Sequence, residues 1–131
     1  MNTTSQAGTG FHAIVKELNK NQSWRYEVGV FTSQTQWLNW AKLSLRNYKP
    51  IIIDINSYGY NWPYATAGHY MVVSGLNLDY QGASPSDINL QAIVQTVKIN
   101  DPYRSGEGIK WHPFSRIYGM NYQHKDNAII Y

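Results

Sequence analysis

Apolar residues follow helical spacing in two early segments of the chain. The first set has the i, i+3, i+4, i+7 spacing of one buried helical face and comprises Phe11, Ile14, Val15 and Leu18. This spacing predicts a short helix over residues 9–18, capped by Thr9. A second helix is predicted over residues 36–47, with its N-cap between Ser33 and Gln36. Its apolar stripe is wide, which favours a helix that lies flat on a sheet.

The later part of the chain has the patterns of β-strands. Strands are predicted, in chain order, at 51–55, 69–75, 97–101 and 127–131. The imperfect alternation over 24–31 is also compatible with a short strand, and Pro113 starts a short helix that reaches Gly119. Loops are predicted at 56–67, 77–92 and 102–112. Because helices and strands do not alternate as βαβ units, we expect a single α+β domain over 1–131, with a mainly antiparallel sheet of about four strands packed with two N-terminal helices.

Two of these strands place a histidine and an aspartate at matching ends. His69 opens the strand 69–75, and Asp101 closes the strand 97–101. If the two strands pair antiparallel, the start of the first lies beside the end of the second. His69 and Asp101 then become neighbours, and the carboxylate can hold the imidazole in one tautomer. The pair is a candidate general base with its orienting acid. The alternative is a histidine that bonds Asp101 for stability alone.

The composition restricts the chemistry available to the chain. Its 131 residues suit one domain, and none of them is a cysteine. Disulfides, zinc-thiolate sites and a thiol nucleophile are therefore excluded within this sequence. The histidines lack the spacing of a metal site, so neither a metal nor another cofactor is expected.

Charge and hydropathy narrow the choice of partners. The net charge is +3, and the eleven basic residues are scattered along the chain, which argues against nucleic-acid binding. No segment approaches the length of a membrane-spanning helix. A sequence poor in Lys and Glu but rich in Tyr, Asn, Ser and Gln favours a secreted or cell-surface bacterial protein. The N-terminal residues lack the pattern of a signal peptide, so either the protein is cytoplasmic or the sequence begins after its true start.

Five short motifs occur in an order that is found in a peptidase family. They are a helical signature with Gly8-Thr9, Ile14 and Leu18-Asn19, a Lys-Pro-Ile-Ile-Ile strand at 49–53, the pair Trp62-Pro63, a Gly-His-Tyr opening a valine-rich strand at 68–73, and Asp101-Pro102 followed by Trp111. Their order and spacing resemble the bacteriocin-processing-peptidase-like family, family thirty-nine of the papain-like cysteine peptidases, across nearly the whole chain.

The resemblance implies a papain-like fold and peptide hydrolysis by acyl transfer, in which a thiolate attacks the peptide carbonyl and a histidine moves the proton. By this resemblance, His69 corresponds to the family's catalytic histidine and Asp101 to the acid that orients it. In the family, a glutamine and the catalytic cysteine lie upstream of the Gly-Thr segment, and the cysteine opens a long helix. This sequence begins after that region, so the resemblance covers only the sheet-bearing part of the domain.

Aromatic residues flank the predicted site. Within the loop 58–64, Trp62 and Tyr64 are candidates to line a substrate cleft or to stack on sugars, and Trp111 is a third. The alternative is that these rings pack between loops and sheet. Ser57, on the predicted loop 56–67, stays open as a substitute nucleophile.

Two functions follow from these observations. One is a cysteine-peptidase-like domain that lacks its nucleophile, needs a Cys-bearing partner segment to act on peptides or proteins, and is inactive alone. The other is a non-catalytic secreted module whose aromatic cleft binds peptide or cell-wall glycan. In both cases the strands at 51–55 and 69–75 have apolar side chains on both faces of the sheet, and these side chains must be buried. The helix over 36–47 can bury only one of the two faces. We therefore expect the chain to form a homo-oligomer or to bind a partner through the other face.

Overall fold

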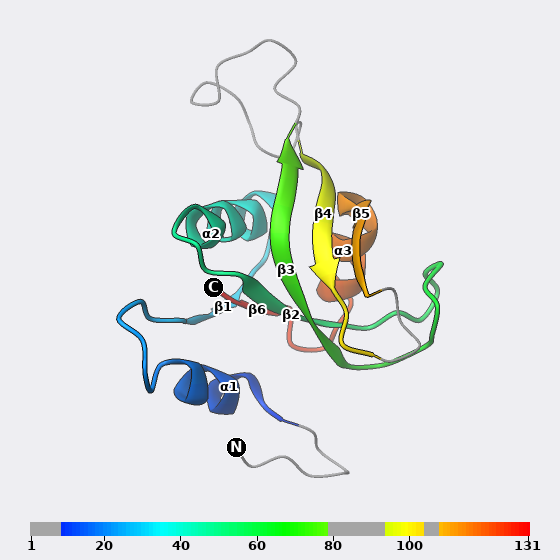
Figure 1. The fold of residues 1–131 in the computed structure, drawn as a ribbon. Coiled ribbons are helices and arrows are strands. Elements are labelled where there is room, and N and C mark those ends of the chain that lie inside the picture. The colour runs from blue at the N-terminus through cyan, green and yellow to red at the C-terminus, as the bar shows by residue number, and fades with distance from the viewer. Residues whose placement is uncertain (1–8, 79–93, 104–107) are drawn as a thin grey trace.

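The computed structural model describes residues 9–78, 94–103 and 108–131. The strands are β1 (Val28–Val30), β2 (Ile51–Ile55), β3 (His69–Leu78), β4 (Val94–Asn100), β5 (Ile109–Pro113) and β6 (Ala128–Ile130). The helices are α1 (Phe11–Leu18), α2 (Gln34–Arg46) and α3 (Phe114–Tyr122). Within the described residues the strands form one six-stranded sheet in the order β1-β6-β2-β3-β4-β5, and all neighbours are antiparallel (Figure 1). The expected α+β class with an antiparallel sheet is confirmed.

The two faces of the sheet are covered differently. Side chains alternate between the faces along each strand, so Ile53 and its partner Met71 share one face, whereas Ile52 and Tyr70 lie on the other. The face of Ile53 packs against α2 and α3 and forms the larger core. The face of Ile52 packs against α1 in a smaller cluster around β1 and β6. Helix α1 therefore covers part of the second face.

Helix α2 lies flat on β2 and β3, as its wide apolar stripe predicts. Trp37, Leu38 and Ala41 are fully buried in the larger core. The Oγ of Ser33 accepts a hydrogen bond from the backbone N–H of Gln36 at 3.2 Å, which satisfies one of the unpaired N–H groups at the helix start. The predicted N-cap is therefore confirmed.

Helix α1 spans the apolar set from Phe11 to Leu18, but it does not start at residue 9 as predicted. The N-cap is Gly10, with an extended backbone, and no side chain caps the helix. Thr9 is therefore not the cap. Its carbonyl oxygen instead accepts a hydrogen bond from the Tyr70 hydroxyl at 2.7 Å, which ties the residue to β3.

The sheet has more strands than the apolar pattern predicts. The short β1 forms within the weak alternation over 24–31, and β5 forms within the segment 102–112 that was expected to be a loop. Only His112 is buried in β5, so this strand has no apolar alternation, and its pairing with β4 rests on backbone hydrogen bonds. β3 also continues to Leu78, and the remainder of the predicted excursion over 77–92 lies outside the described residues.

Helix α3 is anchored by a buried asparagine. The side-chain N–H groups of Asn121 donate to the carbonyl oxygens of Asp54 and Ala128, at 2.8 and 3.1 Å. Its Oδ1 accepts a hydrogen bond from the Trp37 indole N–H at 2.8 Å. One fully buried side chain thus links α2, α3, β2 and β6. None of the helices in the described part of the chain has the length and apolar character needed to span a bilayer.

Candidate functional site

His69 and Asp101 contact each other at the end of the sheet where β3 begins. The Nε2 of His69 lies 2.9 Å from the Oδ1 of Asp101. The register pairs Val72 with Asn100, so Asp101, one residue beyond β4, lies diagonally across from His69 on the same face. The side-chain contact expected from the strand ends is therefore present.

Three donors hold the Asp101 carboxylate, whose side chain is fully buried. Besides the His69 ring, the Tyr64 hydroxyl donates to Oδ2 at 2.5 Å, and the backbone N–H of Tyr103 donates to Oδ1 at 2.9 Å. A carboxylate held at both oxygens accepts the Nε2–H of the imidazole in one fixed geometry. The other ring nitrogen, Nδ1, is then the atom left to exchange a proton with a reacting group.

Two aromatic rings enclose the His69 imidazole. Tyr64 meets it edge-on with ring centroids 5.4 Å apart, and Tyr103 does so at 5.7 Å. The two tyrosine rings contact each other, with centroids 4.2 Å apart. Burial and the bond to Asp101 raise the pKa of Tyr64, so its hydroxyl stays protonated and continues to donate. The His69 side chain keeps 21% of its surface exposed, which leaves the ring accessible to a small reactant.

Of the two tryptophans expected in a cleft, Trp62 contacts Tyr64, which in turn contacts His69. The Trp62 ring meets the Tyr64 ring edge-on, with centroids 6.3 Å apart, and its centroid lies 4.8 Å from that of the His112 ring. Trp111 pairs with Lys98 on the opposite face of the sheet from Asp101 and is half exposed. The expectation that Trp111 lines the same cleft is not met, because the strand pairing of β5 directs this ring to the other face.

Ser57 stabilises the aromatic loop and is not a candidate nucleophile. It is buried, and its Oγ donates to the carbonyl of Tyr64 at 2.7 Å while accepting from the backbone N–H of Thr66 at 2.9 Å. These bonds close the loop that carries Tyr64 toward Asp101. A hydroxyl engaged in this way is not available to attack a substrate.

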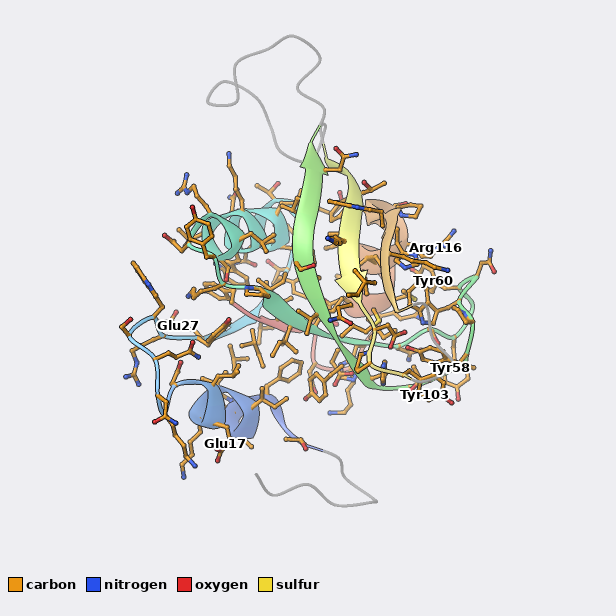
Figure 2. All side chains as sticks on the ribbon, in the orientation of Figure 1. Glu17, Glu27, Tyr58, Tyr60, Tyr103 and Arg116 are labelled. Carbon is orange, nitrogen blue, oxygen red and sulfur yellow. The ribbon has the colours of Figure 1, made fainter. Side chains whose placement is uncertain are left out.

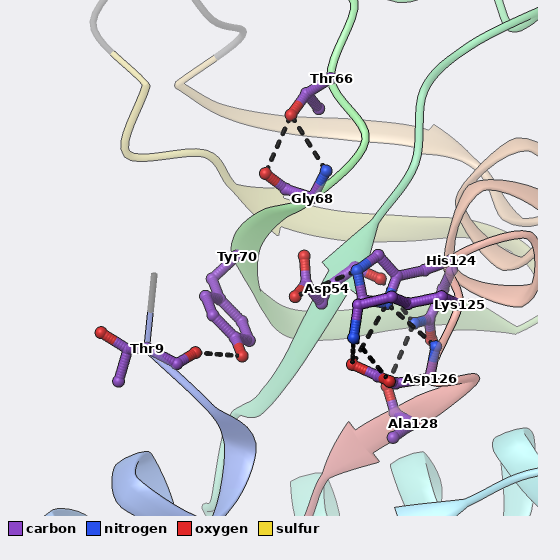
Figure 3. A network of polar contacts seen from close by, with 10 residues as sticks. Thr9, Asp54, Thr66, Gly68, Tyr70, His124, Lys125, Asp126 and Ala128 are labelled. Carbon is purple, nitrogen blue, oxygen red and sulfur yellow. Dashed lines mark hydrogen bonds and ion pairs between the residues drawn. The ribbon is translucent and has the colours of Figure 1, made fainter. Parts of the chain in front are cut away.

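Two features of the site were missed by the sequence analysis. Tyr103 follows Asp101 by two residues, and the Asp-Pro turn that places it was visible in the sequence. Asp54 lies within an apolar run and faces a cavity of about 540 Å³ on the side of the sheet that carries α1. Figure 3 shows Asp54 between Tyr70 and His124. His124 comes from the segment after α3, and no local pattern links it to β2.

The described residues contain no group of three or more His, Cys, Asp or Glu side chains arranged to hold a metal ion. A scan of the sequence against protein-family models finds no match, and searches of the curated proteins and of the solved structures find none either. The resemblance to the papain-like peptidases therefore rests on the ordered motifs. The architecture that is established is a six-stranded antiparallel α+β fold.

Proposed function

We propose that this chain is the histidine- and aspartate-bearing part of a papain-like cysteine-peptidase-like domain. In this proposal His69 is the general base, Asp101 orients it, and a thiol comes from a segment or partner chain outside the 131 residues. The observation that carries the proposal is the 2.9 Å contact between His69 Nε2 and Asp101 Oδ1. It joins a partly exposed imidazole to a fully buried carboxylate.

The chemistry of such a site is acyl transfer. The Nδ1 of His69 takes the proton of the thiol, and the thiolate attacks the peptide carbonyl carbon to give a thioester as the amine leaves with that proton. Water then hydrolyses the thioester, with His69 acting as base and returning the proton to the thiol. Asp101 accepts the Nε2–H throughout and stabilises the imidazolium that forms after each proton transfer.

The isolated chain is expected to be inactive on peptides. In a catalytic triad, loss of the nucleophile removes nearly all of the rate that the other members supply. The remaining His69–Asp101 pair has no group of its own on which to act. Its competence as a base must therefore be measured with an added thiol.

A small thiol and an activated ester provide this test. We expect the chain to accelerate the reaction of 2-mercaptoethanol with p-nitrophenyl acetate, with saturation in the thiol. Replacement His69→Ala should lower the protein-dependent rate by about a hundredfold, which lies within the usual contribution of a positioned base. His12→Ala, which removes an exposed histidine on α1, is the matched control and should leave the rate unchanged. Equal rates for the two variants would contradict the proposal.

A second candidate is a non-catalytic secreted binding module. Three tyrosines on the loops around the site keep large exposed fractions: Tyr58 at 58%, Tyr60 at 36% and Tyr103 at 44%. They lie on one side of the molecule (Figure 2). Exposed aromatic rings of this kind bind sugars and extended peptides by stacking.

Ligand titration separates the two functions. Binding of chitooligosaccharide, followed by intrinsic fluorescence, would favour the module if Tyr58→Ala and Tyr103→Ala weaken it. The same titration on His69→Ala should then give unchanged affinity. Absence of saturable glycan binding, together with a His69-dependent thiol reaction, would leave the peptidase-like function.

A further inference from the structure

The basic residues are unevenly distributed over the fold. The first fifty residues contain six of the eleven basic residues and only two acidic ones, Glu17 and Glu27. These fifty residues include α1, β1 and α2, which lie on the left of the molecule in Figure 1. Such a charge asymmetry between two parts of a chain is typical of proteins that bind a nucleic acid or a membrane surface.

A lysine joins two of the segments that carry this charge. The Lys49 ammonium donates a hydrogen bond to the Arg25 carbonyl at 2.8 Å and lies 5.2 Å from the centroid of the Tyr26 ring. The segment between α1 and β1 is thereby tied to the end of α2. We call these two segments, residues 20–27 and 42–49, the basic edge.

The basic edge has more positive than negative charge. It contains five basic residues and one acidic residue, Glu27, whose Oε2 lies 3.5 Å from the Tyr131 hydroxyl. Of the basic side chains, Arg25 and Arg46 are exposed, and neither forms an ion pair within the described residues. A guanidinium group pairs well with phosphate, so this edge is complementary to a partner that carries phosphate groups.

Two large aromatic side chains are exposed on the same two segments. Trp24 precedes Arg25 and is 60% exposed, and Tyr48 precedes Lys49 and is 95% exposed. The backbone of Tyr48 also has a φ of 58°, in the left-handed region that favours glycine. Packing inside the fold therefore does not account for a tyrosine at this position, whereas contact with a partner would.

The exposed apolar groups favour a membrane over a nucleic acid. Trp and Tyr are enriched at the level of the lipid headgroups, and nearby Lys and Arg are attracted to anionic lipids. A ring as exposed as Tyr48 has almost no protein surface around it against which a nucleotide could lie, but a bilayer can receive such a ring directly. The exposed Leu43 adds an aliphatic side chain that a bilayer would bury.

We propose that the basic edge binds the surface of an anionic lipid bilayer, with the Trp24 and Tyr48 rings at the level of the headgroups and the two exposed arginines facing the lipid phosphates. This inference goes beyond the proposed function, because it requires neither the dyad nor a thiol.

The arrangement leaves the candidate site accessible. Glu27, within the basic edge, lies on the opposite side of the molecule from Tyr58 and Tyr103 (Figure 2). Tyr103 contacts the His69 ring. A chain bound to a membrane through the basic edge would therefore keep His69 directed away from the lipid.

Sedimentation with lipid vesicles tests the proposal. One preparation contains phosphatidylcholine alone, and the other contains equal amounts of phosphatidylcholine and anionic phosphatidylglycerol. We expect saturable binding to the mixed vesicles, weakened by added salt because salt screens exposed charges. We expect no binding to the neutral vesicles.

Charge variants test the arginines. Arg25→Gln and Arg46→Gln should each weaken binding to the mixed vesicles about fivefold, which is the usual contribution of one cation near an anionic membrane. The matched control is Arg116→Gln on α3, since Arg116 lies on the far side of the molecule from Glu27 (Figure 2). This control should bind the vesicles like the parent chain.

Ring variants separate binding from folding. Glycine adopts a positive φ without strain and is favoured just after a helix, so Tyr48→Gly should unfold at an equal or higher denaturant concentration than the parent chain. Loss of the ring should nevertheless weaken vesicle binding several-fold, and Trp24→Ala should do the same. Tyr58→Ala removes an exposed ring on the far side and should leave vesicle binding unchanged.

The proposal is overturned if the parent chain does not bind the mixed vesicles, or if Trp24→Ala and Tyr48→Gly bind them as tightly as the parent chain. It is also overturned if a thymidine oligonucleotide binds the chain more tightly than the mixed vesicles do and both arginine variants weaken that binding, because the basic edge would then be a nucleic-acid site. None of these outcomes depends on the thiol reaction that tests His69.

Discussion

The hydroxyl of Tyr64 donates to the Oδ2 of Asp101 while the ring of the same tyrosine meets the His69 imidazole edge-on at 5.4 Å. One side chain thus positions both members of the dyad. Its loop is held in turn by Ser57, whose hydroxyl bonds the Tyr64 carbonyl. Tyr64 is therefore a positioning residue for His69, and its two contacts can be separated by mutation.

Replacement Tyr64→Phe keeps the ring and removes the donor. A buried carboxylate oxygen left without its donor costs about 1–3 kcal/mol, so the free energy of unfolding should fall by this amount. Chemical denaturation measures it. The thiol-dependent ester rate should fall as well, whereas Tyr60→Phe, on the same loop, should leave the rate unchanged. An unaltered rate in Tyr64→Phe would show that His69 is held by Asp101 alone.

The stability of the fold should decrease at alkaline pH. Burial raises the pKa of both Tyr64 and Tyr70. A phenol whose pKa is higher in the folded chain binds its proton more tightly there, so its contribution is present below the ordinary tyrosine pKa of about 10 and is lost as the pH rises above it. Denaturation at a series of pH values from neutral upward should show this decline. In Tyr64→Phe the decline should be shallower, and an identical slope would contradict the assignment.

The pKa of Asp54 is raised as well. Because an aspartate ordinarily titrates near about pH 4, its effect on stability begins in the acidic range and not at alkaline pH. Burial raises its pKa, so the folded chain is progressively destabilised, relative to an uncharged side chain, as the pH rises through the carboxyl range. We therefore expect Asp54→Asn to unfold at higher denaturant concentration than the parent chain at pH 7. The difference should vanish toward about pH 4, the ordinary pKa of an aspartate. A less stable variant at pH 7 would mean that the pair with His124 outweighs the cost of burial.

The strands that were predicted correctly are those whose apolar side chains are buried. The run of isoleucines in β2 and the valine-rich β3 have fully buried residues on one face, so pattern and burial agree. β5 was missed because its backbone pairs with β4 while only His112 is buried. The start of α1 was placed too early because Thr9 uses its carbonyl to bond Tyr70.

The contact between His69 and Asp101 could be predicted, because the two residues lie at the ends of consecutive strands. The cavity could not, because its residues come from segments far apart in the sequence. His69 and Asp101 end consecutive strands of one antiparallel pair, so the topology brings them together. Asp54 meets His124 only because β6 pairs with β2 and returns the segment after α3 to this side of the sheet. That pairing depends on tertiary packing and has no signature in either segment.

Asn121 illustrates a further limit, since nothing in the sequence marks it as the anchor of α3. Its replacement by Ala would leave the Trp37 indole N–H and the carbonyls of Asp54 and Ala128 without their partners inside the core. We expect a loss of roughly 2–4 kcal/mol in the free energy of unfolding. Asn47→Ala, which removes a half-buried side chain at the end of α2 that bonds the Leu43 carbonyl, is the control and should cost well under half of this. Comparable losses in both variants would contradict the anchoring role.

The edge of the sheet at β5 should mediate association with a second copy of the chain. β5 is the last strand of the sheet in the described residues, and edge strands present unpaired backbone groups that can pair with another chain. It also exposes Ile109 at 64% and Trp111 at 50%. Both side chains lie on the face of the sheet that carries α1, where α1 packs only on the part around β1 and β6. Two copies related by a two-fold axis would pair β5 with β5 and bury these side chains against each other.

Sedimentation velocity should therefore show a dimer whose dissociation constant rises in Ile109→Lys. An apolar side chain transferred from an interface to water costs about 1.5–3 kcal/mol, and a two-fold interface contains it twice, so the constant should rise by roughly two orders of magnitude or more. Leu43→Lys changes a side chain of α2 that is 44% exposed and lies away from β5, and this variant should dimerise like the parent chain. If the parent chain sediments as a monomer at high concentration, or if Leu43→Lys weakens the dimer as much as Ile109→Lys does, then β5 is not the interface.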